Sequence, residues 1–159
     1  MDQPVQVEAP RGMYSAKLDD RGRLKISADF LPWFEAHKGE KLYVTSLDRK
    51  IGSIYPLDVW RENERLFQSP GFDPRLARIL TFNAADLGGD ADLDNQGRIQ
   101  LPQELRKELG MENGSVVRLY AYKRRIEVMS ERLYAERRHE ATTLLTADDI
   151  AKAEANGLQ

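Results

Sequence analysis

Hydrophobic and polar residues alternate along two short stretches of the chain that lie 75 positions apart. The apolar positions are Leu24 and Ile26 in the first stretch, and Ile99 and Leu101 in the second. Alternation with a period of two is typical of a half-buried strand, because successive side chains point to opposite faces. Burying the four apolar residues directs the intervening side chains to solvent. These outward positions hold Arg23, Lys25, Arg98 and Gln100.

The remaining pattern predicts two copies of one unit, in which two strands joined by a turn precede a helix, a hairpin and a second helix. Proline, serine and glycine mark the helix ends. We expect strands at 14–18, 23–26, 42–47, 51–55, 98–101, 116–122 and 126–129. We expect helices at 32–37 (closed by Gly39), 56–67, 74–82, 102–109, after Ser130, and at 146–155. The last helix has no counterpart in the first copy.

The two copies are also similar residue by residue. Residues 18–30 align with residues 93–105, and 4 of these 13 pairs are identical. Each copy with its flanks is about 50 residues, too few to form a stable core alone, so we expect the copies to share one core. Two copies rather than many favour a pair related by a pseudo-two-fold axis over a solenoid.

This pattern divides the chain into five segments. We expect a flexible arm at 1–10, a first repeat at 11–67, a helical connector at 68–89, a second repeat at 90–138 and an acidic tail at 139–159.

The turn before each outward arginine has its own chemistry. It stands as Asp19-Asp20-Arg21-Gly22-Arg23 and as Asp94-Asn95-Gln96-Gly97-Arg98. Short acidic side chains accept hydrogen bonds from nearby backbone amides, and glycine supplies a positive φ. An arginine at such a strand start can contact phosphate or a guanine edge. The preceding aspartate can orient that arginine.

Composition argues against disulfides, a zinc site and a membrane-spanning segment. The chain has no cysteine, and its two histidines, His37 and His139, lack metal-ligand spacing, so we expect neither disulfides nor a zinc site. No apolar run is long enough to cross a membrane, and the N-terminus lacks the pattern of a signal peptide. We therefore expect a cytoplasmic protein without a membrane partner.

Charge is unevenly distributed along the chain. The net charge is −2, but residues 11–25 carry +3, residues 118–138 carry +4, and residues 140–159 carry −3. Such a chain can still bind an anion on one basic face.

The repeated turns resemble those of the MraZ family, whose members carry two copies of the swapped-hairpin barrel found in AbrB- and SpoVT-type regulators. The family's Asp-x-x-x-Arg turn containing Gly-Arg stands at 19–23 and at 94–98. The flanks agree at Arg11-Gly12, at Tyr-Pro-Leu-Asp-Val-Trp of 55–60, and at Pro102 followed by Leu105-Arg106. The resemblance covers residues 11–138. The first copy departs from the family at Ser27, where proline is usual, and at Leu31-Pro32, where a basic residue is usual.

The resemblance implies an α+β fold of tandem AbrB-like barrel repeats with short helices and helical connectors. It implies a bacterial transcriptional regulator that is nucleoid-associated and needs no cofactor. Such a regulator binds double-stranded DNA at direct repeats upstream of its own operon in the cell-division and cell-wall cluster. It also implies a homo-oligomeric ring that binds DNA along its edge. We expect DNA to contact Arg21, Arg23, Lys25, Arg98 and Arg106, and the turns to be oriented by Asp19, Gly22, Asp94 and Gly97.

Two other functions stay open from the residues alone. The acidic tail is a candidate for binding another protein, as in antitoxins that combine this barrel with a tail. The adjacent Asp19-Asp20 pair suggests a hydrolase, but no nucleophile, metal ligand or apolar pocket accompanies it, and we expect neither catalysis nor a small-molecule substrate.

Overall fold

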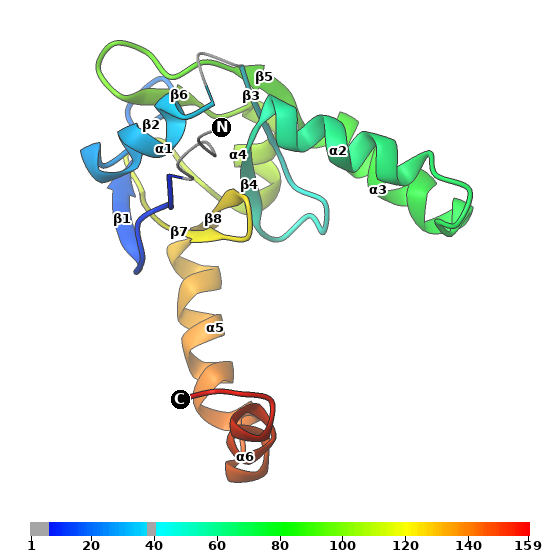
Figure 1. The fold of residues 1–159 in the computed structure, drawn as a ribbon. Helices are drawn as coiled ribbons and strands as arrows, with labels where there is room; N and C mark the ends of the chain where they lie inside the picture. The colour runs from blue at the N-terminus through cyan, green and yellow to red at the C-terminus, as the bar shows by residue number, and fades with distance from the viewer. Residues whose placement is uncertain (1–6, 38–40) are drawn as a thin grey trace, which may run out of the picture.

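The fold combines antiparallel sheets with short helices, which confirms the expected α+β class (Figure 1). The computed structural model describes residues 7–37 and 41–159. Gly39, the expected helix stop, lies outside these residues. Residues 1–6 of the expected arm at 1–10 also lie outside them.

The first repeat contains four strands and three helical segments, followed by a connecting helix. They are β1 (Tyr14–Lys17), β2 (Arg23–Lys25), the 3-10 helix η1 (Ala28–Phe30), α1 (Leu31–Glu35), β3 (Leu42–Thr45), β4 (Gly52–Pro56), α2 (Leu57–Phe67) and the connecting α3 (Pro74–Leu87).

The second repeat follows the same order and ends in two further helices. They are β5 (Gly89–Ala91), β6 (Arg98–Gln100), α4 (Gln103–Leu109), β7 (Val116–Tyr122), β8 (Arg125–Ser130), α5 (Glu131–Leu144) and α6 (Ala147–Ala155). Ser130 and Thr146 cap α5 and α6 through their hydroxyl oxygens, which accept backbone N–H groups in the first turn.

The strands of the two repeats are interleaved in one six-stranded sheet, in the order β1-β7-β8-β4-β3-β5. The pairing is two-fold symmetric: Tyr14 pairs with Leu119, and the positions 75 residues away, Gly89 and Val44, also pair. Each repeat therefore gives its first strand to the hairpin of the other, as the predicted pseudo-two-fold requires.

A separate two-stranded ladder of β2 and β6 covers the sheet. The isolated bridges Leu18–Leu24 and Leu93–Ile99 link it back to the chain just after β1 and β5. Among the described residues no continuous ladder joins β1 to β5, so hydrogen bonding does not close the expected barrel.

Both repeats contribute to the main hydrophobic core, which confirms the expectation that they share it. Leu24 and Phe30 come from the first repeat, and Ile99 and Leu105 come from the second; all four are fully or almost fully buried. Because side chains of both halves fill the same interior, neither half could bury these residues without the other.

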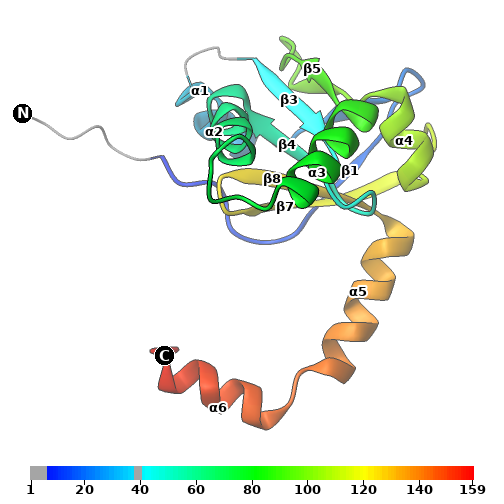
Figure 2. The same ribbon diagram turned by 90° about the vertical axis from the view of Figure 1, so that its right-hand side faces the viewer.

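Two pairs of helices project beyond this core, whereas α1 and α4 bury side chains in it. α2 and α3 form a pair that extends to one side, and α5 and α6 form a C-terminal arm that leads away from the sheets (Figures 1 and 2). No residue of α5 or α6, both fully described, is buried. No helix in the described part of the chain has the length and hydropathy to cross a bilayer.

One prediction from the sequence was wrong in this helical part. α3 extends five residues past the expected end at 82, because Ala84 and Leu87 are buried and the Asn83 side chain donates to the Leu47 carbonyl at 2.8 Å. Trp60 of α2 is only 5% exposed and stacks on Tyr43 with ring centroids 4.8 Å apart, so it packs α2 against the sheet.

Replacing Leu24 with alanine should lower the free energy of unfolding by about 2–5 kcal/mol, because it opens a cavity in the core shared by both repeats. Urea denaturation measures this loss. The matched control, Leu66→Ala in α2, removes an exposed side chain and should change stability by less than about 0.5 kcal/mol. Equal losses in the two variants would contradict the shared core.

Candidate nucleic-acid interface

The first turn is organised by a single carboxylate. One oxygen of Asp19 accepts the backbone N–H groups of Arg21 and Arg23, both at 2.9 Å. Its other oxygen accepts the side-chain Nε–H of Arg23 at 2.7 Å. Gly22 closes the turn at φ +75°, a conformation that side-chain-bearing residues rarely adopt. The aspartate thus fixes both the backbone of the turn and the arginine that follows.

The second turn has the same geometry. Asp94 accepts the backbone N–H groups of Gln96 and Arg98 at 2.8 and 2.9 Å, and the Nε–H of Arg98 at 2.8 Å. Gly97 also has φ +75°. The predicted turn-orienting roles of the two aspartates and two glycines therefore have a direct structural counterpart.

Hydrogen bonds to the charged carboxylates alter their pKa. The pKa of Asp19 is lowered to about 2, chiefly by the backbone N–H of Arg23 and then by the Arg23 side chain. The pKa of Asp94 is lowered by the equivalent bonds from Arg98. Both groups are therefore carboxylates at neutral pH, with no proton to donate.

The two turns place their arginines on one face. In the β2–β6 ladder Arg23 pairs with Gln100, and Lys25 pairs with Arg98. Leu24 and Ile99 pair between them and point into the core. Arg23 and Arg98 are therefore diagonal neighbours on the outer face. Diagonal residues of an antiparallel pair typically have Cα atoms about 7–8 Å apart.

Each arginine uses only part of its guanidinium within the chain. Arg23 and Arg98 donate from Nε to their aspartates, and in the described part of the chain no hydrogen bond involves their Nη atoms. Their side chains are 26% and 25% exposed. Each turn thus holds the stem of its arginine and leaves the end of the guanidinium for an external acceptor.

Of the five predicted DNA-binding residues, four belong to this face or to its first turn. Arg23 and Arg98 stand on the ladder, Lys25 is exposed beside Arg98, and Arg21 is exposed in the turn. Arg106 differs, since its guanidinium lies against the first turn, where a methyl group on Gly22 would overlap it. It donates to the Leu101 carbonyl at 3.1 Å and to the Asn113 side chain at 3.0 Å.

Sequence reasoning missed two residues of this region. The Gln100 side chain donates to the Arg21 carbonyl at 2.8 Å, and the Asn113 side chain donates to the Asp20 carbonyl at 2.8 Å. The first contact joins residues 79 positions apart and the second joins residues 93 positions apart, so each links one repeat to the other. No local motif identifies them, because only the two-fold arrangement brings the segments together.

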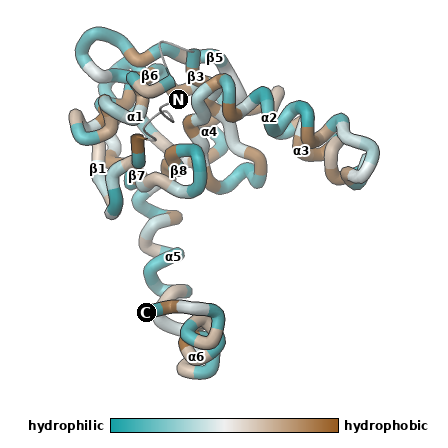
Figure 3. The backbone as a smooth tube through the Cα atoms, in the orientation of Figure 1, coloured by the Kyte–Doolittle hydropathy of each residue, from teal (hydrophilic) through white to brown (hydrophobic). Residues whose placement is uncertain are grey.

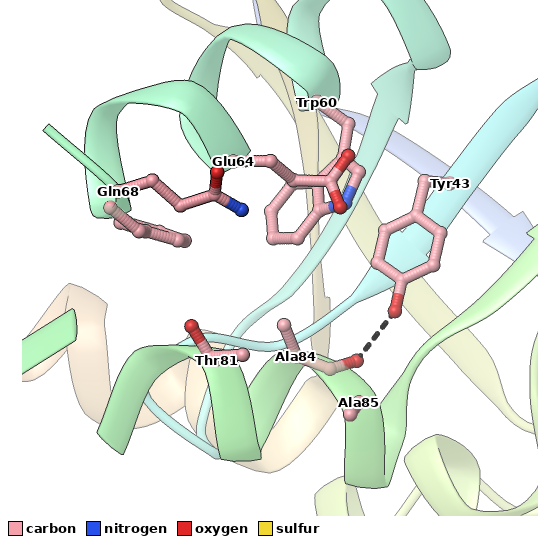
Figure 4. A pocket seen from close by; sticks show the side chains of 8 residues that line it. Tyr43, Trp60, Glu64, Gln68, Thr81, Ala84 and Ala85 are labelled. Carbon is pink, nitrogen blue, oxygen red and sulfur yellow. Dashed lines mark hydrogen bonds between the residues drawn. The ribbon is translucent and has the colours of Figure 1, made fainter. Parts of the chain in front are cut away.

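A pocket between α2 and α3 is the other candidate site (Figure 4). It has a volume of about 370 Å³ and is lined mainly by Tyr43, Trp60, Glu64 and Phe67. The Tyr43 hydroxyl already donates to the Ala84 carbonyl at 2.7 Å, and Trp60 is packed against Tyr43. These groups hold α2 and α3 to the sheet.

Within residues 7–37 and 41–159, no group of three acidic, histidine or cysteine side chains could hold a metal ion.

The lowered pKa of Asp19 predicts a stability change in acid. Because its folded-state pKa of about 2 lies below the ordinary 3.8, the unfolded state takes up the proton first as the pH falls. Stability should therefore be complete above about pH 5 and decline as the pH falls toward 2. Urea midpoints across this range should fall less steeply in Asp19→Asn. The neighbouring control, Asp20→Asn, should keep the wild-type slope, and equal slopes in all three proteins would contradict the assignment.

Comparison with known proteins identifies the family of the chain. No protein-family model matches the chain. A protein of Acidobacterium capsulatum named transcriptional regulator MraZ is 32% identical over 91% of this chain and 97% of its own length. Proteins of the same name from Desulfitobacterium hafniense and Herpetosiphon aurantiacus are 31% and 38% identical, over 79% and 67% of this chain and 83% and 71% of their own lengths. The chain therefore belongs to the MraZ family of transcriptional regulators.

Proposed function

We propose that this protein binds double-stranded promoter DNA in a sequence-specific manner through the outer face of the β2–β6 ladder. The target is a set of direct repeats upstream of its own operon, in the cell-division and cell-wall cluster. The protein acts there in the cytoplasm, on the nucleoid. The observation that carries the proposal is the pair of arginines, Arg23 and Arg98, held on one face by equivalent aspartates, with no hydrogen bond to their Nη atoms in the described part of the chain.

The geometry of the ladder suits a duplex. The major groove of B-DNA admits a two-stranded β-ribbon, and arginine donates two parallel hydrogen bonds to a guanine edge or to a phosphate. Because each aspartate already orders its arginine, less side-chain entropy is lost on binding. Arg21 and Lys25 add exposed positive charge beside the pair.

One copy of this face would bind weakly. The chain has a net charge of −2, so long-range attraction to DNA is small. Several linked copies raise the effective concentration of each further site, with avidity gains on the order of a hundredfold or more. We propose that the chain forms a ring whose subunit spacing matches the spacing of the DNA repeats.

Two exposed apolar surfaces support assembly with a second copy of the chain. α3 carries three exposed apolar residues, Leu76, Ile79 and Phe82, of which Phe82 is 65% exposed. Hydrophobic positions along α3 appear in brown in Figure 3. The C-terminal arm of α5 and α6 carries Leu144, which is 71% exposed, and Leu145, which lies where α5 leads into α6. The two surfaces differ in structure, and a contact between unlike surfaces builds rings when its rotation closes.

A second candidate function uses the same arm. The lack of buried side chains along α5 and α6 also suits an element that binds a different protein, as in antitoxins. In that case the oligomeric state would not depend on the arm.

Replacing both Arg23 and Arg98 with alanine should abolish the binding of the upstream DNA, because it removes the guanidinium groups that contact bases and phosphates. Fluorescence anisotropy with labelled duplex measures the affinity. The slope of log K against log salt should become shallower by about 0.9 for each phosphate that the variant no longer neutralises.

The matched control is Arg132→Ala with Arg138→Ala, which removes the same charge from exposed positions of α5. This control should bind DNA almost as well as the wild type. Circular dichroism would verify that both double variants are folded. Unchanged DNA binding in a folded Arg23/Arg98 variant would overturn the assignment of the site.

Removal of residues 142–159 distinguishes the two uses of the arm. If the arm joins subunits, light scattering after size exclusion should give a mass of several subunits for the full chain and a smaller mass for the truncated one. An unchanged mass would contradict the role of the arm in assembly and would favour the interaction-module alternative.

A further inference from the structure

The two turns have the same internal geometry but different surroundings. Their aspartate-to-arginine Nε distances differ by only 0.1 Å, at 2.7 and 2.8 Å, and both glycines have φ +75°. The side chains that the opposite repeat places against the two turns, however, are not equivalent.

Three side chains of the second repeat clamp the first turn. Gln100 donates to the Arg21 carbonyl at 2.8 Å and to the Gly22 carbonyl at 3.3 Å. The Arg106 guanidinium lies on Gly22, which is buried beneath it, and donates to Asn113. Asn113 in turn donates to the Asp20 carbonyl at 2.8 Å. We define Gln100, Arg106 and Asn113 as the clamp.

Among residues 7–37 and 41–159, no such clamp holds the second turn. The positions 75 residues before Gln100 and Arg106 hold Lys25 and Leu31, and the position matching Asn113 lies outside the described residues. A leucine has no donor for the turn, and within the described part of the chain no side chain of the first repeat donates to residues 94–97. A methyl group on Gly97 would meet only the Ile26 carbonyl, at 3.7 Å.

Backbone pairing between the repeats is nevertheless the same on both sides. Leu101 N–H donates to the Gly22 carbonyl at 3.1 Å, and Ile26 N–H donates to the Gly97 carbonyl at 2.8 Å. The backbone hydrogen bond at the second turn is the shorter of the two. The inequality therefore lies in the side chains of the clamp.

We propose that Arg106 is a positioning residue that makes the first turn a rigid reader of DNA, while the second turn stays adaptable. This inference rests on the proposed DNA-binding function. A rigid turn presents the Arg23 guanidinium in one geometry, which rewards the correct base edge and penalises others. An adaptable turn lets Arg98 follow the phosphates of any sequence. Arg23 then determines specificity, and Arg98 contributes mainly affinity.

Arg106→Leu tests this directly, because it gives the second repeat the residue that the first repeat has at the matching position. The matched control is Lys107→Leu, an exposed neighbour on α4. In the wild type the Gly22 amide should exchange with deuterium more slowly than the Gly97 amide. Arg106→Leu should raise the rate at Gly22 without changing the rate at Gly97, and Lys107→Leu should change neither.

The second measurement is the ratio of affinities for upstream promoter duplex and for a shuffled duplex of equal length. Arg106→Leu should lower this ratio by about tenfold, the scale of one well-formed base contact, while affinity for shuffled DNA stays within about twofold. Asn113→Ala removes a clamp donor without touching α4 and should act in the same direction, which covers the case in which Arg106→Leu does not fold.

The possible failures are distinguishable. Equal exchange rates at Gly22 and Gly97 in the wild type would overturn the unequal turns, whatever the protein binds. An unchanged affinity ratio in folded Arg106→Leu would overturn the positioning role of Arg106. Absence of wild-type binding to either duplex would instead overturn the proposed function, and the exchange rates would still test the clamp.

Discussion

The carboxylate at the start of each turn is the contact on which the rest of this structure depends. It accepts two backbone N–H groups, which closes the turn, and one side-chain N–H, which orders the arginine. The closed turn then sets the register of β2 against β6. That register decides which side chains enter the core. Local chemistry over five residues therefore determines both a core position, at Leu24, and an outward cation beside it.

The two-fold pairing converts these local turns into a common surface. β2 and β6 can lie side by side only because each repeat lends its first strand to the other, so that both turns emerge at the same side of the shared core. A face with paired arginines is then a consequence of the sheet order.

Much of this arrangement could be predicted from the sequence, because its determinants are local. Alternation indicated the strands around Leu24 and Ile99, and the Asp-to-Gly spacing indicated the turns. The clamp could not be predicted, since Asn113 contacts a carbonyl 93 positions away. The true end of α3 was missed because packing against the sheet, rather than helix propensity, decides it.

The exchange of first strands has an evolutionary consequence. A chain with a single repeat could build this core only as a homodimer, in which every substitution would occur twice. Duplication and fusion into one polypeptide release the two copies from that identity. Only then can one copy keep an arginine at position 106 while the other holds a leucine at position 31. Covalent linkage of the two repeats thereby permits their turns to have different surroundings, as the contacts of Gln100 and Asn113 with the first turn illustrate.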